Sequence, residues 1–129
     1  MRATLLIVLG LAIGIISAAF ATSVFRSRNP LPKALMNVME YHIDGLKQSV
    51  ASGQCEAGAS RLKLQQMSMA SIDVAPAFAG ADPDFLHLAG RLRGVLADAA
   101  QASPADCHAL DATIKPVLQA CHDCHRKYD

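Results

Sequence analysis

Hydrophobic positions recur at steps of three and four residues along most of this chain, which predicts amphipathic helices. No strand-like alternation competes with this pattern. Four helices are expected, over about residues 33–51, 54–72, 82–102 and 103–128. Their predicted inner faces carry, in chain order, Leu35, Met36, Met39, Ile43, Leu46 and Val50; Ala59, Leu62, Met69 and Ile72; Phe85, Leu88, Leu92, Val95 and Ala99; and Cys107, Leu110, Ile114, Val117, Cys121, Cys124 and Tyr128.

Capping and turn residues predict where these helices end. Ser52–Gly53 is predicted to end the first helix, because Gly is favoured just past a helix end. Asp82–Pro83 and Ser103–Pro104 each place a capping residue before a proline, which predicts the starts of the third and fourth helices. Residues 73–83 are read as a connection, and Pro116 predicts a kink in the fourth helix. Short connections between four amphipathic helices predict an all-α, antiparallel up-down-up-down four-helix bundle.

The N-terminal segment, residues 1–25, is expected to be a signal peptide or a membrane anchor. Positions 3–25 hold no charged residue and are long enough to span a bilayer. Ala19–Ala21 offers an A-x-A cleavage site, which favours a signal peptide. Residues 26–32 read as a linker, and 33–129 as one domain in the periplasm, either soluble after cleavage or anchored to the inner membrane.

Composition narrows the classes of function. The net charge is +1, from 12 basic and 11 acidic residues, so no basic field suggests nucleic acid. The ionisable residues scatter along the helices at positions expected for solvated faces, Arg91 and Glu40 among them. We therefore expect no enzyme.

The run Cys121-His122-Asp123-Cys124-His125 is the attachment signature for haem c. Two thiols on one helical turn suit covalent addition to the two vinyl groups of a porphyrin, and His125 then lies beneath the iron as proximal ligand. His122 and Asp123 are read as spacers. A thioredoxin-like pair would need a strand before the motif, and a zinc site would need a second pair of ligands.

The expected bundle geometry suggests a sixth ligand for that iron. In an up-down-up-down bundle, the end of the fourth helix lies beside the start of the first, where Met36 and Met39 share the inner stripe. Either thioether is a candidate distal ligand, against the alternative of ordinary core packing. His42 is a third candidate.

The remaining cysteines, Cys55 and Cys107, are expected together at the opposite end of the bundle. An intrachain disulfide is then feasible in an oxidising compartment. Closing a loop of that length would be worth ~4 kcal/mol. Two unpaired or intermolecular thiols are the alternative.

Residues 32–129 resemble the cytochrome c-prime superfamily, including its low-spin, six-coordinate members. The resemblance rests on the C-terminal Cys-x-x-Cys-His, on Tyr128 three residues after His125, and on the run from Leu35-Met36 to Gly53. It implies a four-helix bundle in which a Met of the first helix is the distal ligand in low-spin members, with Met36 the better match and Met39 the alternative. The chain departs from the family pattern at two positions, having Pro32 instead of a basic residue and Asp129 instead of Arg.

The expected function is single-electron transfer by one covalently bound haem c between periplasmic redox partner proteins. If no Met reaches the iron, the alternative is a five-coordinate haem protein that binds nitric oxide or carbon monoxide. A third alternative is a haem-free thiol or zinc protein. Related bundles often dimerise through their first two helices, so a homodimer stays open. Contact with a membrane is expected only if the N-terminal segment is uncleaved.

Overall fold

The computed structural model describes the backbone of residues 2–27, 30–78 and 80–128, and side chains within that part from 7–21 and from residue 30 onward. All regular structure in these ranges is helical, so the prediction of an all-α chain is confirmed. The chain divides into two units, residues 1–30 and 31–129, and each is described separately.

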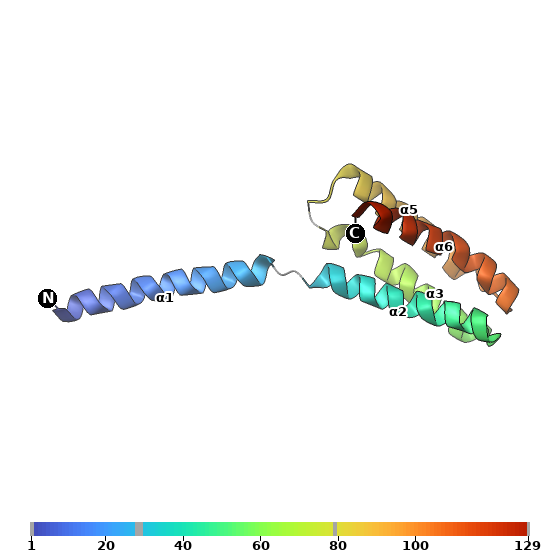
Figure 1. Cartoon of the computed structure of the whole chain (residues 1–129), viewed down its shortest axis with the longest axis horizontal. Helices are drawn as coiled ribbons and strands as arrows, with labels where there is room; N and C mark the ends of the chain where they lie inside the picture. Colours follow the sequence, from blue (N-terminus) through green and yellow to red (C-terminus); the bar gives the residue numbers. More distant parts are fainter. Residues whose placement is uncertain (1, 28–29, 79, 129) are drawn as a thin grey trace. The chain divides into compact units, whose positions relative to one another are not determined.

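The first unit contains one helix, α1 (Arg2–Ser27), drawn in blue in Figure 1. The prediction that a linker begins at residue 26 is wrong, because α1 includes Arg26 and Ser27 and contains no proline that would end it earlier. The proposed cleavage site, Ala19–Ala21, lies inside this helix, and every described side chain of α1 is exposed. Within the described residues, no helix meets the length and apolarity needed to cross a membrane.

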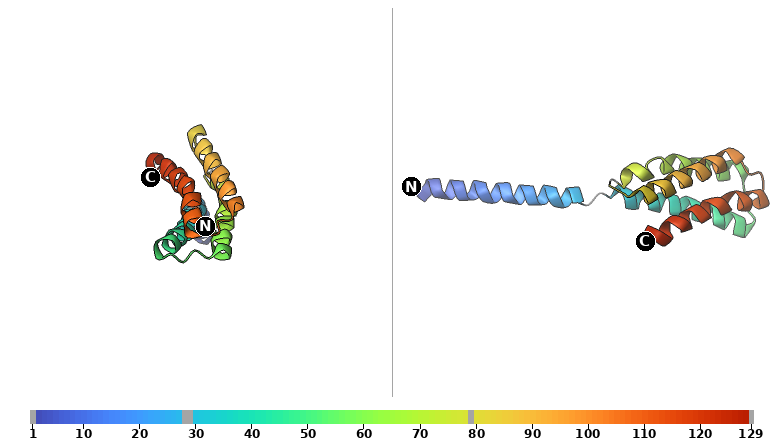
Figure 2. Two further views of the ribbon diagram at one scale, coloured as in Figure 1. Left: turned by 90° about the vertical axis from the view of Figure 1, so that its right-hand side faces the viewer. Right: turned by 90° about the horizontal axis from the view of Figure 1, so that it is seen from above.

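In its described residues, the second unit contains four long helices and one short helix, which share a core (Figures 1 and 2). The first long helix, α2, packs against α3 and α6, and α5 packs against the same two helices. This arrangement is compatible with a helical bundle. The elements are α2 (Leu31–Ser52), α3 (Ala57–Ser71), α4 (Val74–Ala77), α5 (Pro83–Ala102) and α6 (Cys107–Tyr128).

Side-chain caps mark the starts of α5 and α3, but the sequence predicted only the first of these two starts. Asp82 caps α5 as predicted, since its carboxylate accepts the Phe85 amide at 2.9 Å. The helix predicted from residue 54 instead begins at Ala57, after Glu56, whose carboxylate accepts two backbone amides. The predicted linker also ends earlier than expected, because α2 already begins at Leu31 and a proline is tolerated in a first helical turn.

The predicted start of the fourth helix at Ser103 is wrong. Ser103 has φ 45° and ends α5 in the left-handed conformation, which cannot begin a right-handed helix. Asp106 caps α6 instead, because its carboxylate accepts the Ala109 amide at 2.8 Å. Pro116 lies inside a continuous α6, and the kink there stays a prediction. The expected connection over residues 73–83 also contains the four-residue helix α4.

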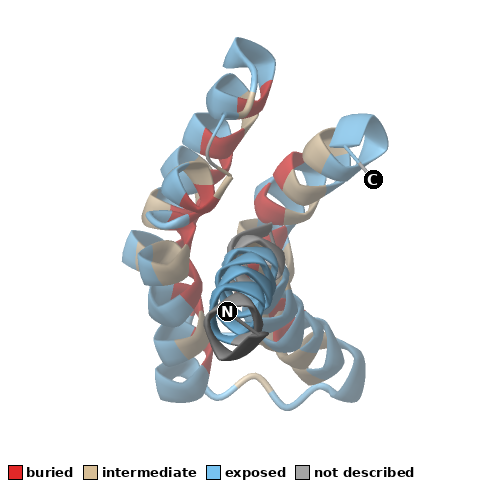
Figure 3. Ribbon diagram, turned by 90° about the vertical axis from the view of Figure 1, so that its left-hand side faces the viewer, coloured by how far each residue is buried: buried red, intermediate tan, exposed pale blue. Residues whose placement is uncertain are grey.

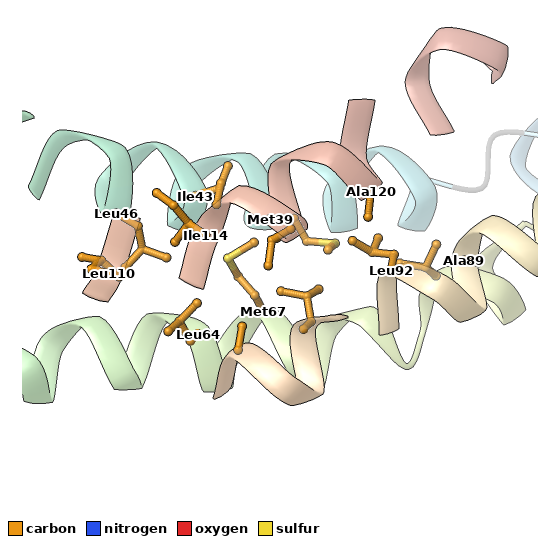
Figure 4. Packing of buried hydrophobic residues seen from close by; sticks show 14 of the residues in the cluster. Met39, Ile43, Leu46, Leu64, Met67, Ala89, Leu92, Leu110, Ile114 and Ala120 are labelled. Carbon is orange, nitrogen blue, oxygen red and sulfur yellow. The ribbon is translucent and has the colours of Figure 1, made fainter. Parts of the chain in front are cut away.

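The core lies where the four long helices face one another, as the red residues in Figure 3 show. Its predicted members on α2, α5 and α6 are mostly buried, and Met39, Leu46, Leu92 and Ile114 belong to the cluster drawn in Figure 4. The predicted inner face of the second helix is wrong. Leu62, Met69 and Ile72 are exposed, and Ala59 with them. The inner face of α3 carries Ser60, Leu64, Met67 and Ser71.

Candidate cofactor site

The cysteine motif lies in the last two turns of α6. Cys121 and Cys124 are half-buried reduced thiols one helical turn apart, and His125 follows them directly. Residues 107–120, immediately before the motif, are helical. This contradicts the thioredoxin-like alternative, in which the thiols stand at a helix N-terminus after a strand.

Two adjoining cavities run along the contact between α2 and α6. The larger measures about 320 Å³ and the smaller about 240 Å³. Both are lined by Met36, Cys124 and His125, so the second thiol and the imidazole of the motif face the same space as a thioether from α2. The larger cavity also has Pro32, Lys33, Phe78, Phe85 and Tyr128 in its wall, and the smaller has Met39, Glu40, Ile43, Leu92 and Cys121.

The three candidate distal ligands, Met36, Met39 and His42, differ in burial and in the cavities that they border. Met36 is half-buried and borders both cavities, as His125 does. Met39 is 5% exposed, belongs to the core and borders only the smaller cavity. His42 borders neither, although its Nδ1 atom is buried with no hydrogen-bond partner. The geometry therefore favours Met36.

The surroundings of the thiols are largely apolar. Burial raises the pKa of the Cys121 thiol, and the neighbouring charge of a Cys124 thiolate raises it further. Among the described residues, Lys33 and Glu40 are the only Lys, Arg, Asp or Glu side chains that line these two cavities. A large apolar group with a few polar atoms fits such a space better than a small ion.

An aromatic cluster closes the larger cavity beside the end of α6. The Tyr128 ring meets Phe85 edge-on at 5.4 Å between centroids, and Phe85 packs on Phe78 at 4.7 Å. The Tyr128 hydroxyl donates to Asp82 at 2.7 Å, which lowers the pKa of that carboxyl. The residue that caps α5 therefore also holds the last turn of α6.

Two residues that the sequence interpretation set aside form a link between α5 and the motif. Asp123, read as a spacer, is only 15% exposed and accepts hydrogen bonds from Gln119 at 2.7 Å and from Arg91 of α5 at 2.8 Å. These two donors lower the pKa of Asp123. Arg91 was expected on a solvated face, and no sequence pattern distinguishes it from the other basic residues. His122, in contrast, is exposed and lines neither cavity.

The other two cysteines form a disulfide. Cys55, between α2 and α3, is bonded to Cys107 at the start of α6, with their Cα atoms 5.1 Å apart. About 21 Å of helix separates Cys107 from Cys121. The disulfide and the motif thus occupy different parts of α6.

The donor set fits haem c. Two thiols one turn apart, an imidazole directly after the second and a thioether from a facing helix all border the adjoining cavities. The larger cavity is of a size usual for cofactor sites, about 300–1,000 Å³. Among the described side chains, no group of three or more His, Cys, Asp or Glu is arranged to hold a metal ion. No family model, curated protein or solved structure matches this chain.

Proposed function

We propose that this chain is a periplasmic mono-haem c-type cytochrome that carries single electrons between redox partner proteins. The observation that carries the proposal is the convergence of Cys124, His125 and Met36 on the two adjoining cavities. A Cys-x-x-Cys-His motif on its own predicts covalent haem attachment. The facing thioether adds the second axial ligand that an electron carrier needs.

Each residue has a separate task in this proposal. Cys121 and Cys124 form thioether bonds that anchor the porphyrin edge. The His125 imidazole is the proximal ligand and the Met36 thioether the distal one, a combination that raises the reduction potential. Haem supplies iron that alternates between the ferrous and ferric states. The apolar walls, Leu92 and Phe85 among them, exclude water from its surroundings.

We also propose that the second unit is an antiparallel four-helix bundle of the cytochrome c-prime type. Residues 84 and 91 of α5 pair with residues 127 and 123 of α6, so sequence numbers rise on one helix as they fall on the other. The contacts of α2 with α3 and α6, and of α5 with the same pair, support the proposed closed order of helices. Dimerisation through α2 and α3 remains part of the family expectation.

The Cys55–Cys107 disulfide supports export, because disulfides persist in oxidising compartments such as the periplasm. Haem c is also attached there in bacteria. We propose that the segment ahead of the second unit acts as a signal peptide, cleaved after Ala21. Mass spectrometry of the mature chain identifies its first residue and tests this step.

The central test is haem content after expression of the full chain in a host that matures c-type cytochromes. We expect one haem per chain by the pyridine haemochrome assay, and a denatured mass increased by one haem. The matched control, Cys121→Ser/Cys124→Ser, should carry no covalent haem. A colourless wild-type protein with the mass of the polypeptide alone contradicts the proposal.

The choice of distal ligand is tested on the coloured protein. We expect the reduced wild type to show a sharp low-spin spectrum that carbon monoxide does not change. Met36→Leu should become high-spin and bind carbon monoxide, whereas the control Met39→Leu should keep the wild-type spectrum, since the two side chains have similar volume. A wild type that is already high-spin and binds carbon monoxide favours the gas-binding alternative.

A further inference from the structure

Full burial of α6 side chains ends just before the cysteine motif, where Cys121 and Cys124 pack half-buried against the edge of the core. Its buried residues are Leu110, Ile114, Val117 and Ala120, and none of the described residues from 121 to 128 is buried. Terminal turns of a helix fray unless tertiary contacts hold them. The position of His125 therefore depends on polar links to α5 as well as on this partial packing.

Beside the Tyr128–Phe85 ring contact, three polar side-chain links between described residues join this end of α6 to α5 and its capping residue. Asp123 pairs with Arg91, Lys127 pairs with Asp84, and Tyr128 donates to Asp82. Two of them come after His125 in the chain. The Arg91–Asp123 link alone among these three acts inside the motif, on the residue between the two cysteines.

The Arg91–Asp123 pair is also the better shielded ion pair. The difference lies in the carboxylates, since Asp123 is 15% and Asp84 72% exposed, whereas Arg91 at 46% and Lys127 at 50% are alike. Shielding matters, because ion pairs in full contact with water contribute little. Gln119, one turn earlier in α6, donates to the other oxygen of the Asp123 carboxylate and so fixes its orientation toward Arg91.

We propose that Arg91 is a positioning residue for the cofactor. Through Asp123 it holds the Cys-x-x-Cys-His turn against α5, and so keeps His125 at the cavities that Met36 also lines. The effect of Arg91 on the iron rests on the proposed function. Its effect on the helical turn does not. Arg91 itself lines neither of those two cavities; with Asp123 it borders a separate cavity of about 500 Å³ that is lined mostly by charged side chains.

The experiment compares full-length Arg91→Met and Asp123→Asn with wild type. The matched control is Lys115→Met, which removes the same charge from an ion pair confined to α6, Lys115–Asp111. The first measurement is amide hydrogen exchange, which does not depend on haem. We expect exchange over residues 121–127 to be about fivefold faster in the two test variants. Residues 107–114 should be unchanged.

The second measurement uses the haem-loaded protein. Haem content should equal that of wild type, because the thiols are intact, while a high-spin fraction that binds carbon monoxide should appear in Arg91→Met and Asp123→Asn. Arg91→Lys keeps the positive charge and should restore most of the low-spin spectrum. Lys115→Met should match wild type in both measurements.

Two outcomes overturn the inference. One is exchange over 121–127 that does not change in either test variant. The other is a wild-type spectrum in Arg91→Met and Asp123→Asn despite faster exchange, because the link would then hold the turn without positioning the ligand. A wild type without haem refutes the proposed function instead, and exchange in that same preparation still decides whether Arg91 holds the turn.

Discussion

The Cys55–Cys107 disulfide closes a loop across 52 positions of sequence, from the α2–α3 connection to the first residue of α6. The double variant Cys55→Ser/Cys107→Ser opens that loop. In the chain-entropy model, a loop of this length restricts the unfolded chain by about 14 cal/mol/K, or about 4 kcal/mol at 25 °C. A domain of about 100 residues has a total stability of about 5–15 kcal/mol, so the loss is a large fraction of the whole.

Urea unfolding followed by circular dichroism measures this loss directly. We expect the free energy of unfolding to fall by about 4 kcal/mol in the double variant. Added reductant should lower the free energy of unfolding of the wild type toward that of the variant and leave the variant's value unchanged. This comparison separates the effect of the Cys55–Cys107 bond from any effect on Cys121 and Cys124. A loss below about 1 kcal/mol with an unchanged denaturant slope would refute the reasoning.

Three further predictions concern the second unit. Leu46→Ala should lower the free energy of unfolding by about 2–5 kcal/mol in thermal or urea unfolding, because Leu46 is 0% exposed in the core; a smaller loss would mean that the site collapses around the gap. Gly90→Ala and Gly94→Ala should each raise it by about 1 kcal/mol, since a Cβ at either place meets no atom within 4 Å; destabilisation would show a hidden constraint in α5. Hydrogen bonds from backbone amides lower the pKa of Glu56 below 4.5, so its stabilisation is complete above about pH 4.5 and is lost as the pH falls through the folded pKa. Glu56→Gln should therefore be less stable than wild type at pH 7 and equal to it in acid, and parallel pH profiles would contradict this.

Hydrophobic periodicity was sufficient to predict a helix and its core residues where the inner face of the helix carries large apolar side chains. It located α2, α5 and α6 to within a few residues, and it identified Leu46 and Ile114 as core. It misplaced the inner face of α3, because that face includes Ser60 and Ser71. A serine can be buried when its hydroxyl donates to a nearby carbonyl of its own helix, as Ser71 does to Ser68 at 2.6 Å.

Some residues of the candidate site could likewise be predicted from the sequence, and others could not. Cys121, Cys124 and His125 could be found from sequence, since covalent attachment requires neighbouring residues at fixed spacing. The preference for Met36 over Met39 depended on the structure, in which Met36 borders both cavities and Met39 borders only the smaller one. The Arg91–Asp123 link joins residues 32 positions apart on two helices, so it depends on the rotation and register of both, which no local pattern records.

Three of the four cysteines lie on α6, and their spacing along that helix limits which disulfides can form under oxidising conditions. Four cysteines can pair in three ways, and two of these join Cys121 or Cys124 to Cys55 or Cys107. Once α6 has formed, about 21 Å of rigid helix keeps Cys107 from reaching Cys121. Both alternative pairings require Cys107 to bond Cys121 or Cys124, so a formed α6 excludes them and keeps the motif thiols apart from the Cys55–Cys107 bond.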